Sequence, residues 1–308
     1  RWSPNLQDYI ENGKPMGPDR QGLGWGFQVL PYLEEGAVHN LTTEAQIGPT
    51  IIPIYSCPSR RGITQITFTD ATNGTTTFTL TDYGGIDPCS SLKTPQNSDS
   101  PVTQPPLDLR TQPDPNTVRT YFCQGFGNDQ APFKHSLYDG VIVRTPWVET
   151  GFDRRSLIPI GNYVEDVPYP TKFSGIIDGT SKSMMVAEKY IRYDLYAGGD
   201  ASDDRGWTDG WDADTMRCTC IHPHNDGEID PDHSPTPPLD HNASYYQLML
   251  GSAHTGGFNA VFADGSVHTI NYDIELYVLN ALGTRNGTSA GAGDPATSTE
   301  VSDISSGY

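Results

Sequence analysis

The residues best suited to chemistry in this sequence are six aspartates between positions 200 and 214. Hard cations such as Ca²⁺ bind about six to eight oxygen atoms, which carboxylates and carbonyls on bent loops can supply. Closely spaced carboxylates also repel one another unless a cation neutralises them. The spacing is not that of an EF-hand, so the alternative is a solvated acidic loop packed over Trp207 and Trp211. The predicted Ca²⁺ ligands are Asp200, Asp203, Asp204, Asp209, Asp212 and Asp214.

A second group of carboxylates makes a weaker cation site. It lies in a stretch rich in proline and aspartate and consists of Asp226, Glu228, Asp230 and Asp232. No glycine-rich loop follows a strand and opens a helix, so nucleotide binding has no support. Ca²⁺ is therefore the one cofactor that the sequence favours, and no organic cofactor is expected.

The eight histidines do not form a recognisable catalytic pattern. No pair has the i, i+4 spacing with a glutamate that zinc proteases use. Ala253 follows Gly251-Ser252, so the nucleophile elbow of serine hydrolases is absent. We expect His254 to be structural, with its ring bonded to backbone near a hairpin turn, and we predict that the protein is not an enzyme. The remaining enzymatic hypothesis is a hydrolase in which His254 and Asp264 share an open cleft.

Five cysteines are scattered along the chain without metal-binding spacing. In an exported protein they predict one or two disulfides and one leftover thiol. Cys57 with Cys89 is the expected pair, although connectivity does not follow from sequence alone. The disulfide candidates are Cys57, Cys89, Cys123 and Cys220.

Asn-x-Ser/Thr sequons are potential N-glycan sites on the surface loops of an exported protein. They occur at Asn40, Asn73, Asn242 and Asn286.

A hairpin running into a helix, over residues 251–283, organises the chain. Alternating apolar residues predict a strand, and Asp264-Gly265 is a strong signal for a two-residue type I′ turn. Such a loop pairs Phe262 with Val267, and it places Val267 on the core face together with Phe258, Ala260 and Phe262. The predicted helix begins at an Asp273 N-cap and ends at Gly283, with an apolar face of Ile274, Val278, Ala281 and Leu282.

The rest of the chain is predicted to be rich in strands. A hairpin is expected over residues 63–83 around Asn73-Gly74, and buried strands are expected over residues 51–55 and 183–189. These elements predict an α+β fold dominated by β structure.

Several sequence blocks, together with His254, Asp264 and Gly265, resemble a large family of prepilin-like bacterial surface proteins, known as domain of unknown function 1559. His254, nine further residues and Asp264-Gly265 match its C-terminal H-X9-DG motif, which we expect to be structural. The resemblance implies a pilin-like antiparallel sheet with few short helices and long loop insertions. Members begin with a prepilin signal and an apolar pilin helix, neither of which this sequence contains. The other matching blocks are residues 24–34, 54–61, 178–189 and 204–207.

These blocks and the composition between them predict one domain. Residues 1–22 form an extended N-terminal arm, and residues 23–286 form a single pilin-like α+β domain. Loop insertions are expected at 90–120 and 221–240, and residues 287–308 form a flexible C-terminal tail.

The composition limits the partners. A net charge of −19 argues against nucleic acid, which requires a basic patch. The sequence contains no apolar run of about 20 residues, so no membrane span is expected in this chain. It begins with Arg, as expected of a processed product or a partial chain.

We therefore predict an extracellular or cell-surface protein whose partners are copies of itself. It is expected to be the structural subunit of a filament or surface layer, assembling head to tail by segment or strand exchange, with the N-terminal arm as donor. The alternative is a Ca²⁺-dependent glycan-binding module whose face carries Trp25, Trp147, Trp207 and Trp211. Glycans, attached or bound, are the other expected partners.

Overall fold

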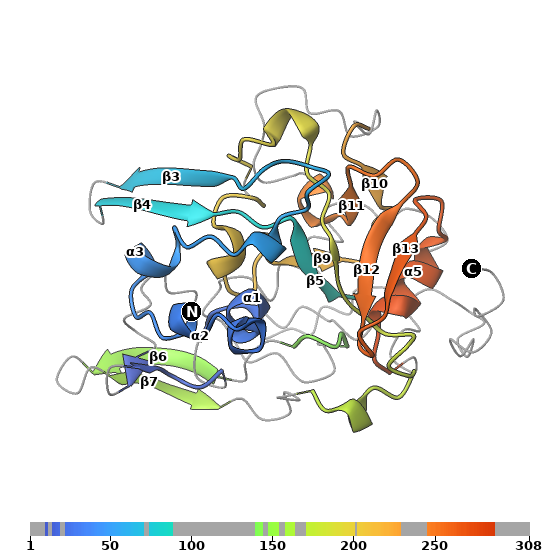
Figure 1. Cartoon of the computed structure of the whole chain (residues 1–308). Helices are drawn as coiled ribbons and strands as arrows, with labels where there is room; N and C mark the ends of the chain where they lie inside the picture. Colours follow the sequence, from blue (N-terminus) through green and yellow to red (C-terminus); the bar gives the residue numbers. More distant parts are fainter. Residues whose placement is uncertain are drawn as a thin grey trace, which may run out of the picture.

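A five-stranded sheet forms the centre of the protein (Figure 1). Its strands are β5 (Tyr83–Asp87), β8 (Met184–Glu188), β9 (Met216–Cys218), β12 (Phe258–Phe262) and β13 (Val267–Ile270). They lie in the order β13-β12-β8-β5-β9. Neighbours are antiparallel except β5 and β9, which are parallel. The predicted α+β, β-dominated class is confirmed, whereas the sheet is mixed rather than purely antiparallel.

The computed structural model describes ten stretches of the chain. These are residues 10–11, 14–18, 22–70, 74–88, 139–143, 147–153, 158–163, 171–200, 202–228 and 245–286. Within them, no helix is both long and apolar enough to cross a membrane. The expected insertion at 90–120 and the tail at 287–308 lie outside the described residues.

The other strands form two-stranded pairs, and the described α-helices are short. The pairs are β1 (Ile10–Glu11) with β2 (Lys14–Pro15), β3 (Gln65–Asp70) with β4 (Gly74–Thr79), β6 (Trp147–Asp153) with β7 (Ile158–Tyr163), and β10 (His224–Asn225) with β11 (Gly251–Ser252). The helices are α1 (Trp25–Gln28), α2 (Gly36–His39), α3 (Glu44–Ile47) and α5 (Leu276–Gly283). The hairpin predicted over 63–83 is therefore confirmed.

Two expectations for surface and buried segments are wrong in detail. Instead of a buried strand at 51–55, Pro53–Tyr55 form a 3₁₀ turn, and Ile54 is 62% exposed. Proline cannot donate to a strand ladder and suits the first position of a helical turn. Residues 221–228, expected to belong to a surface insertion, instead contribute β10 and a buried Ile221.

The turn between β12 and β13 differs from the expected type. The N–H of Gly265 donates to Phe262 O, and the N–H of Phe262 donates to Ser266 O, both at 2.9 Å. The loop therefore has three residues, and of these only Gly265 has positive φ, at 85°. Val267 consequently pairs with Val261 rather than Phe262. A slip of one residue moves a side chain to the other face of a sheet, and Val267 is 66% exposed instead of buried.

Helix α5 packs its apolar face on the sheet. Leu276, Leu279 and Leu282 recur at helical spacing, and all three are buried with Phe258 and Ala260 in one core cluster. The expected N-cap is wrong, because the helix begins after Glu275 rather than Asp273. Of the expected apolar face, Leu282 is buried in this cluster, and Ile274 and Ala281 pack against it. The N–H of Ile274 bonds to Asn271 O in a separate turn, and this turn ends before the helix starts.

A second core lies under the N-terminal helices. Its buried members are Phe27, Leu30, Ile47, Ile52, Tyr55 and Trp207. Trp207 comes from the aspartate-rich segment, so this segment is tied to the N-terminal region by apolar packing. In Figure 1, α1–α3 and the β3–β4 hairpin lie to the left of β5, and β12, β13 and α5 lie to its right.

Of the arm expected at residues 1–22, only part is described. β1 pairs with β2 in a short hairpin, and Met16 after it is buried. The described part of the arm is therefore folded rather than fully extended.

Gly206 is the position where the aspartate-rich segment approaches β4 most closely. Its φ is 64°, and a Cβ added there would lie 2.0 Å from Thr79 O. We predict that Gly206→Ala destabilises the fold by more than about 3 kcal/mol, because left-handed strain and a backbone clash add up. Chemical unfolding measures this effect. Gly199→Ala is the matched control: φ is 100° with no atom within 4 Å, so it should cost only the backbone strain. Equal losses in the two variants would contradict the prediction.

Candidate functional site

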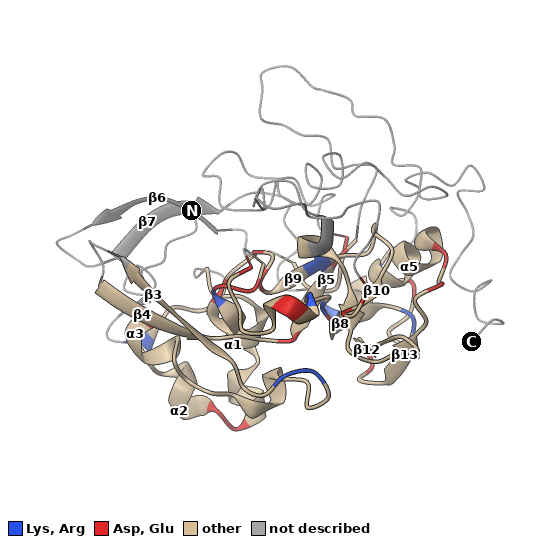
Figure 2. Cartoon of the chain, turned by 90° about the horizontal axis from the view of Figure 1, so that it is seen from above, with Lys and Arg blue, Asp and Glu red and all other residues tan. Residues whose placement is uncertain are grey.

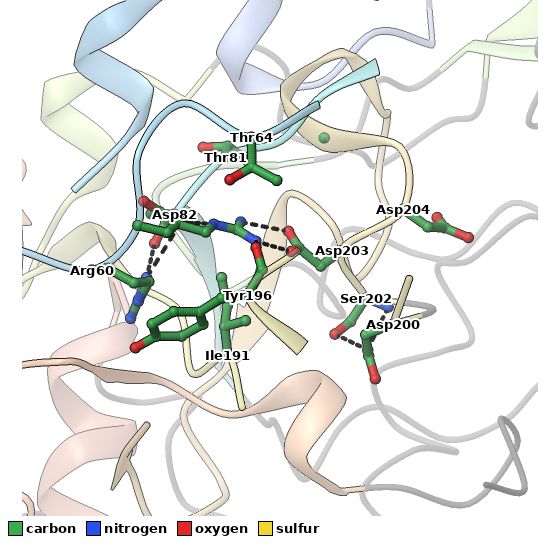
Figure 3. A network of polar contacts seen from close by, with 12 residues as sticks. Arg60, Thr64, Thr81, Asp82, Ile191, Tyr196, Asp200, Ser202, Asp203 and Asp204 are labelled. Carbon is green, nitrogen blue, oxygen red and sulfur yellow. Dashed lines mark hydrogen bonds and ion pairs between the residues drawn. The ribbon is translucent and has the colours of Figure 1, made fainter. Parts of the chain in front are cut away.

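Asp82 is the centre of a buried ionic network, which Figure 3 shows at close range. Its Oδ2 accepts the N–H of Cys57 at 2.7 Å, and its Oδ1 accepts Arg61 Nε at 2.9 Å. Its backbone carbonyl accepts hydrogen bonds from Arg60 Nη1 and from the N–H of Lys189. One acidic residue therefore joins the 57–61 loop to the end of β8.

Arg61 connects this centre to the aspartate-rich segment. Its two terminal nitrogens contact both carboxylate oxygens of Asp203, at 2.5 and 3.1 Å. Lys189 Nζ lies 2.9 Å from the same carboxylate and also donates to the carbonyls of Ser202 and Asp214. A bidentate arginine–carboxylate pair with a further ammonium group is a strong, directional arrangement. Asp203 is therefore held by cations of the chain itself.

Arg60 makes a parallel set of contacts on the other side of the network. Its Nε donates to Asp226 Oδ2 at 2.6 Å, and its Nη2 donates to the carbonyls of Lys189 and Gly251. The Tyr196 hydroxyl donates to the same Asp226 oxygen at 2.8 Å. Asp226, predicted as part of a second cation site, thus pairs with arginine. Asp230 and Asp232 of that prediction lie outside the described residues.

The charges of the network are kept by pairing despite complete burial. Burial by itself raises the pKa of Asp203, but Lys189 and Arg61 outweigh it and hold the pKa at about 2. Burial lowers the pKa of Lys189, and the adjacent Asp203 opposes this shift. Because the ammonium group donates to three oxygens, we assign it as charged. Figure 2 shows Lys, Arg, Asp and Glu gathered beside β5, β8 and β9.

Three of the predicted Ca²⁺ ligands meet in a separate cluster. Asp209, Asp212 and Asp214 each place a carboxylate oxygen within 4.8 Å of the other two. Asp214 is fully buried, and its Oδ1 accepts backbone N–H groups of residues 204, 205 and 206. Its Oδ2 is buried without a hydrogen-bond partner among the described residues. Burial raises the pKa of Asp204 beside this cluster to about 6, and repulsion from Asp212 adds to the shift.

Of the other three predicted ligands, Asp204 lies beside this cluster, and the remaining two have different partners. Asp200 Oδ1 accepts the N–H and the hydroxyl of Ser202, at 2.8 and 2.6 Å. Asp203 belongs to the ionic network. The structure therefore divides the six predicted aspartates between a carboxylate cluster, a local turn and a set of ion pairs.

His254 lies at the end of β12 opposite to the hairpin turn. The expectation that its ring bonds backbone near that turn is wrong. Instead Nε2 lies 3.4 Å from Glu188 Oε1 and 3.9 Å from Cys57 Sγ. Asp264, in the turn itself, accepts the N–H and hydroxyl of Ser266. Because β12 separates His254 from Asp264, the two do not share a cleft.

The cysteines do not pair as expected. Cys57 carries a free, buried thiol, so the predicted bond to Cys89 is wrong. Cys220 is bonded to Cys218, two residues before it, with their Cα atoms 5.6 Å apart. That separation lies within the range a disulfide can bridge. Cys89 and Cys123 lie outside the described residues.

Two of the four sequons can be placed. Asn40 is exposed at the end of α2, where its side-chain amide donates to Gly36 O. Asn286 is half-buried, while Asn73 and Asn242 lie outside the described residues. Glycosylation at these asparagines stays a prediction.

The geometry defines an α+β protein in which segments far apart in the sequence meet at the buried ionic network around Asp82, which forms an ionic junction between them. The chain belongs to the family described as a protein of unknown function (DUF1559), whose model matches residues 9–276. Comparisons with curated proteins and with solved structures found no match. The pilin-like character that the resemblance implies therefore stays a prediction.

Sequence reasoning missed the two aspartates that organise the junction, Asp82 and Asp226. It treated Asp226 as a cation ligand and did not consider Asp82. The available signal was the pair Arg60-Arg61, because two adjacent arginines in a segment that also carries buried residues need carboxylate partners.

Acid should weaken the junction in a defined pH range. A carboxylate with a folded pKa of about 2 stabilises the fold above its unfolded pKa of about 4, and this stabilisation is lost as pH falls from about 4 to about 2. The contribution is roughly 2–3 kcal/mol. Asp203→Asn should be less stable than the wild type by about 3 kcal/mol or more at pH 7. Between about pH 4 and about pH 2, the free energy of unfolding of the variant should fall less than that of the wild type. Urea unfolding at several pH values tests this.

Asp194→Asn is the control, because the side chain of Asp194, which pairs with Arg192, is 42% exposed. It should leave the free energy of unfolding within about 1 kcal/mol of the wild type at every pH. An unchanged acid profile in Asp203→Asn would contradict the assignment.

Proposed function

We propose that this chain is the structural subunit of an extracellular filament or surface layer, in which copies join head to tail by strand addition. The observation that carries the proposal is the open edge of the central sheet at β13. Among the described strands, β13 pairs only with β12. Its residues Val267, His268 and Thr269 are exposed, whereas β9 at the other edge is buried.

The hydrogen-bond pattern identifies the groups that a new strand would meet. Phe262 and Ser266 form a hydrogen-bonded pair, and such pairs alternate along an antiparallel ladder. His268 therefore directs its backbone groups toward β12, and Val267 and Thr269 direct theirs outward. An unpaired edge of this kind is a template for a strand from another chain.

The geometry of such a contact allows copies of the chain to be added one after another. An edge on one copy and a donor segment on the next are different surfaces, so the contact is heterologous, and it gives a filament when the rotation between copies does not close a ring. We keep the N-terminal arm as the predicted donor. An extracellular location agrees with the Cys218–Cys220 disulfide, since disulfides persist in oxidising surroundings.

Proline at the edge tests strand addition. We predict that Thr269→Pro lowers assembly at least about tenfold, because it removes an outward N–H while an edge strand tolerates its ring. Thr269→Val is the matched control, which keeps the N–H and should assemble like the wild type. Light scattering and electron microscopy of native protein measure assembly, and thermal unfolding checks the fold. Equal assembly of both variants, or a wild type that stays monomeric at high concentration, would overturn the proposal.

Ca²⁺ binding is a second candidate function, favoured by the cluster of Asp209, Asp212 and Asp214. Oxygen-only donors on a bent loop suit a hard cation, and an ion would supply the partner that Asp214 Oδ2 lacks. The glycan-binding part of this alternative has less support. Trp207 is 1% exposed, and Trp25 Nε1 donates to Thr215 O inside the protein. These two rings belong to the core rather than to a binding face.

Chelator and Ca²⁺ together test the cluster. After chelator treatment, Ca²⁺ at about 100 times its dissociation constant should stabilise the protein by about 2.7 kcal/mol. Asp212→Asn should remove most of that stabilisation, since it deletes one ligand charge. Asp200→Asn should retain it, because Asp200 belongs to the Ser202 turn. The measurement is thermal unfolding with and without Ca²⁺, and equal responses of the two variants would contradict the assignment.

A further inference from the structure

Three residues from distant parts of the chain meet outside the ionic network. Cys57 follows the 3₁₀ turn at 53–55, Glu188 ends β8, and His254 precedes β12. Their sulfur, carboxylate oxygen and imidazole nitrogen all lie within 4.8 Å of one another. Thiolate, imidazole and carboxylate are the three side-chain ligands that zinc uses in proteins.

Separate hydrogen bonds hold all three residues in place. The N–H of Cys57 donates to Asp82 Oδ2, and Glu188 Oε2 accepts the N–H of Asn259 in β12, both at 2.7 Å. The carbonyl of His254 accepts the Tyr272 hydroxyl, also at 2.7 Å. The backbone positions of Cys57 and His254 and the carboxylate of Glu188 are therefore fixed, which supports the fixed geometry that a metal site requires.

One donor atom has no hydrogen bond. Glu188 is 1% exposed, and its Oε1 is buried without a hydrogen-bond partner in the described part of the chain. His254 Nε2 lies at an ion-pair distance of 3.4 Å from this oxygen. A buried carboxylate oxygen without a partner is costly, and a bound cation would satisfy it.

The separations fit tetrahedral coordination. With Zn–S near ~2.3 Å and Zn–N near ~2.0 Å, tetrahedral geometry places sulfur and nitrogen about 3.6 Å apart, and nitrogen and oxygen about 3.3 Å apart. The observed separations are 3.9 Å between Cys57 Sγ and His254 Nε2, and 3.4 Å between His254 Nε2 and Glu188 Oε1. These two separations therefore need to change by only a few tenths of an ångström, and the third, between Cys57 Sγ and Glu188 Oε1, is within 4.8 Å.

We propose that Cys57, Glu188 and His254 bind a divalent transition-metal ion of the zinc class. The proposal does not depend on the assembly function. The thiol loses its proton to water as the sulfur–metal bond forms. The side chain of His254 is 36% exposed, so water reaches the remaining coordination position. The mixed ligand set separates this site from the oxygen-only aspartate cluster, because sulfur disfavours Ca²⁺.

A cysteine–histidine nucleophile is the competing interpretation of the same residues. A nucleophilic cysteine needs a lowered pKa, and it gains one from nearby cations or a helix N-terminus. Here burial, followed by the adjacent Glu188 carboxylate, raises the pKa of the Cys57 thiol. A carboxylate close to both the thiol and the imidazole opposes an anionic sulfur in the absence of a cation, but it suits a bound cation.

Co²⁺ is the probe for the experiment, because its spectrum reports thiolate ligation directly. The full chain is purified without reductant, so the Cys218–Cys220 disulfide stays closed, and is then freed of metal by chelator. One equivalent of Co²⁺ should give a thiolate-to-metal charge-transfer band that Zn²⁺ abolishes. Cys57→Ser should eliminate the band. Glu188→Gln, which retains the acceptor for Asn259, and His254→Gln should each weaken Co²⁺ binding at least about tenfold.

Two controls make the outcome specific. His268→Gln alters an exposed histidine and Asp212→Asn alters the aspartate cluster, and both should bind Co²⁺ like the wild type. If circular dichroism shows that Glu188→Gln is unfolded, His254→Gln still tests the proposal. The side chain of His254 is 36% exposed, so its replacement disturbs the fold less than replacing the buried Glu188. Absence of the band in the wild type, or its survival in Cys57→Ser, would overturn the proposal.

Discussion

The fold depends on pairing charges that it has removed from water. Arg60 and Lys189 have side chains that are 0% exposed, and they are satisfied only when Asp226 and Asp203 are in place. Breaking one such pair leaves an uncompensated buried charge, which costs about 3–5 kcal/mol. Because the partners come from different segments, no segment of the junction is stable without the others.

This constraint explains which features the sequence could predict. Local patterns placed the hairpin at 65–79 and the strand at 184–188, because alternation and turn residues act over a few positions. The pairing register of strands was harder to predict from the sequence. The turn at Asp264 was located, but its length depends on Ser266 bonding the aspartate side chain, which the dipeptide Asp-Gly does not reveal. One residue of loop length then decided whether Val267 is buried or exposed.

The partners of charged residues were beyond local patterns. Arg60 and Asp226 are separated by 166 positions, and Arg61 and Asp203 by 142. The density of aspartates correctly indicated a cluster of carboxylates. It could not show which of these aspartates would instead form an ion pair with an arginine far away in the sequence. The same limit hid the closeness of Cys57 and His254, which are 197 positions apart. Cys57 is hydrogen-bonded to Asp82 next to β5, and His254 precedes β12, with β8 lying between those two strands.

Strand β8 links the chemistry of the protein to its surface. Successive residues of a strand point to opposite faces, and Glu188 and Lys189 at its end have different partners as a result. Glu188 contacts the thiol and imidazole, and Lys189 enters the ionic junction. β12 pairs with β8 on one side and with β13 on the other. A strand added at β13 would therefore extend a sheet whose interior is fixed by buried charge pairs, so the edge can accept a partner without rearranging the junction.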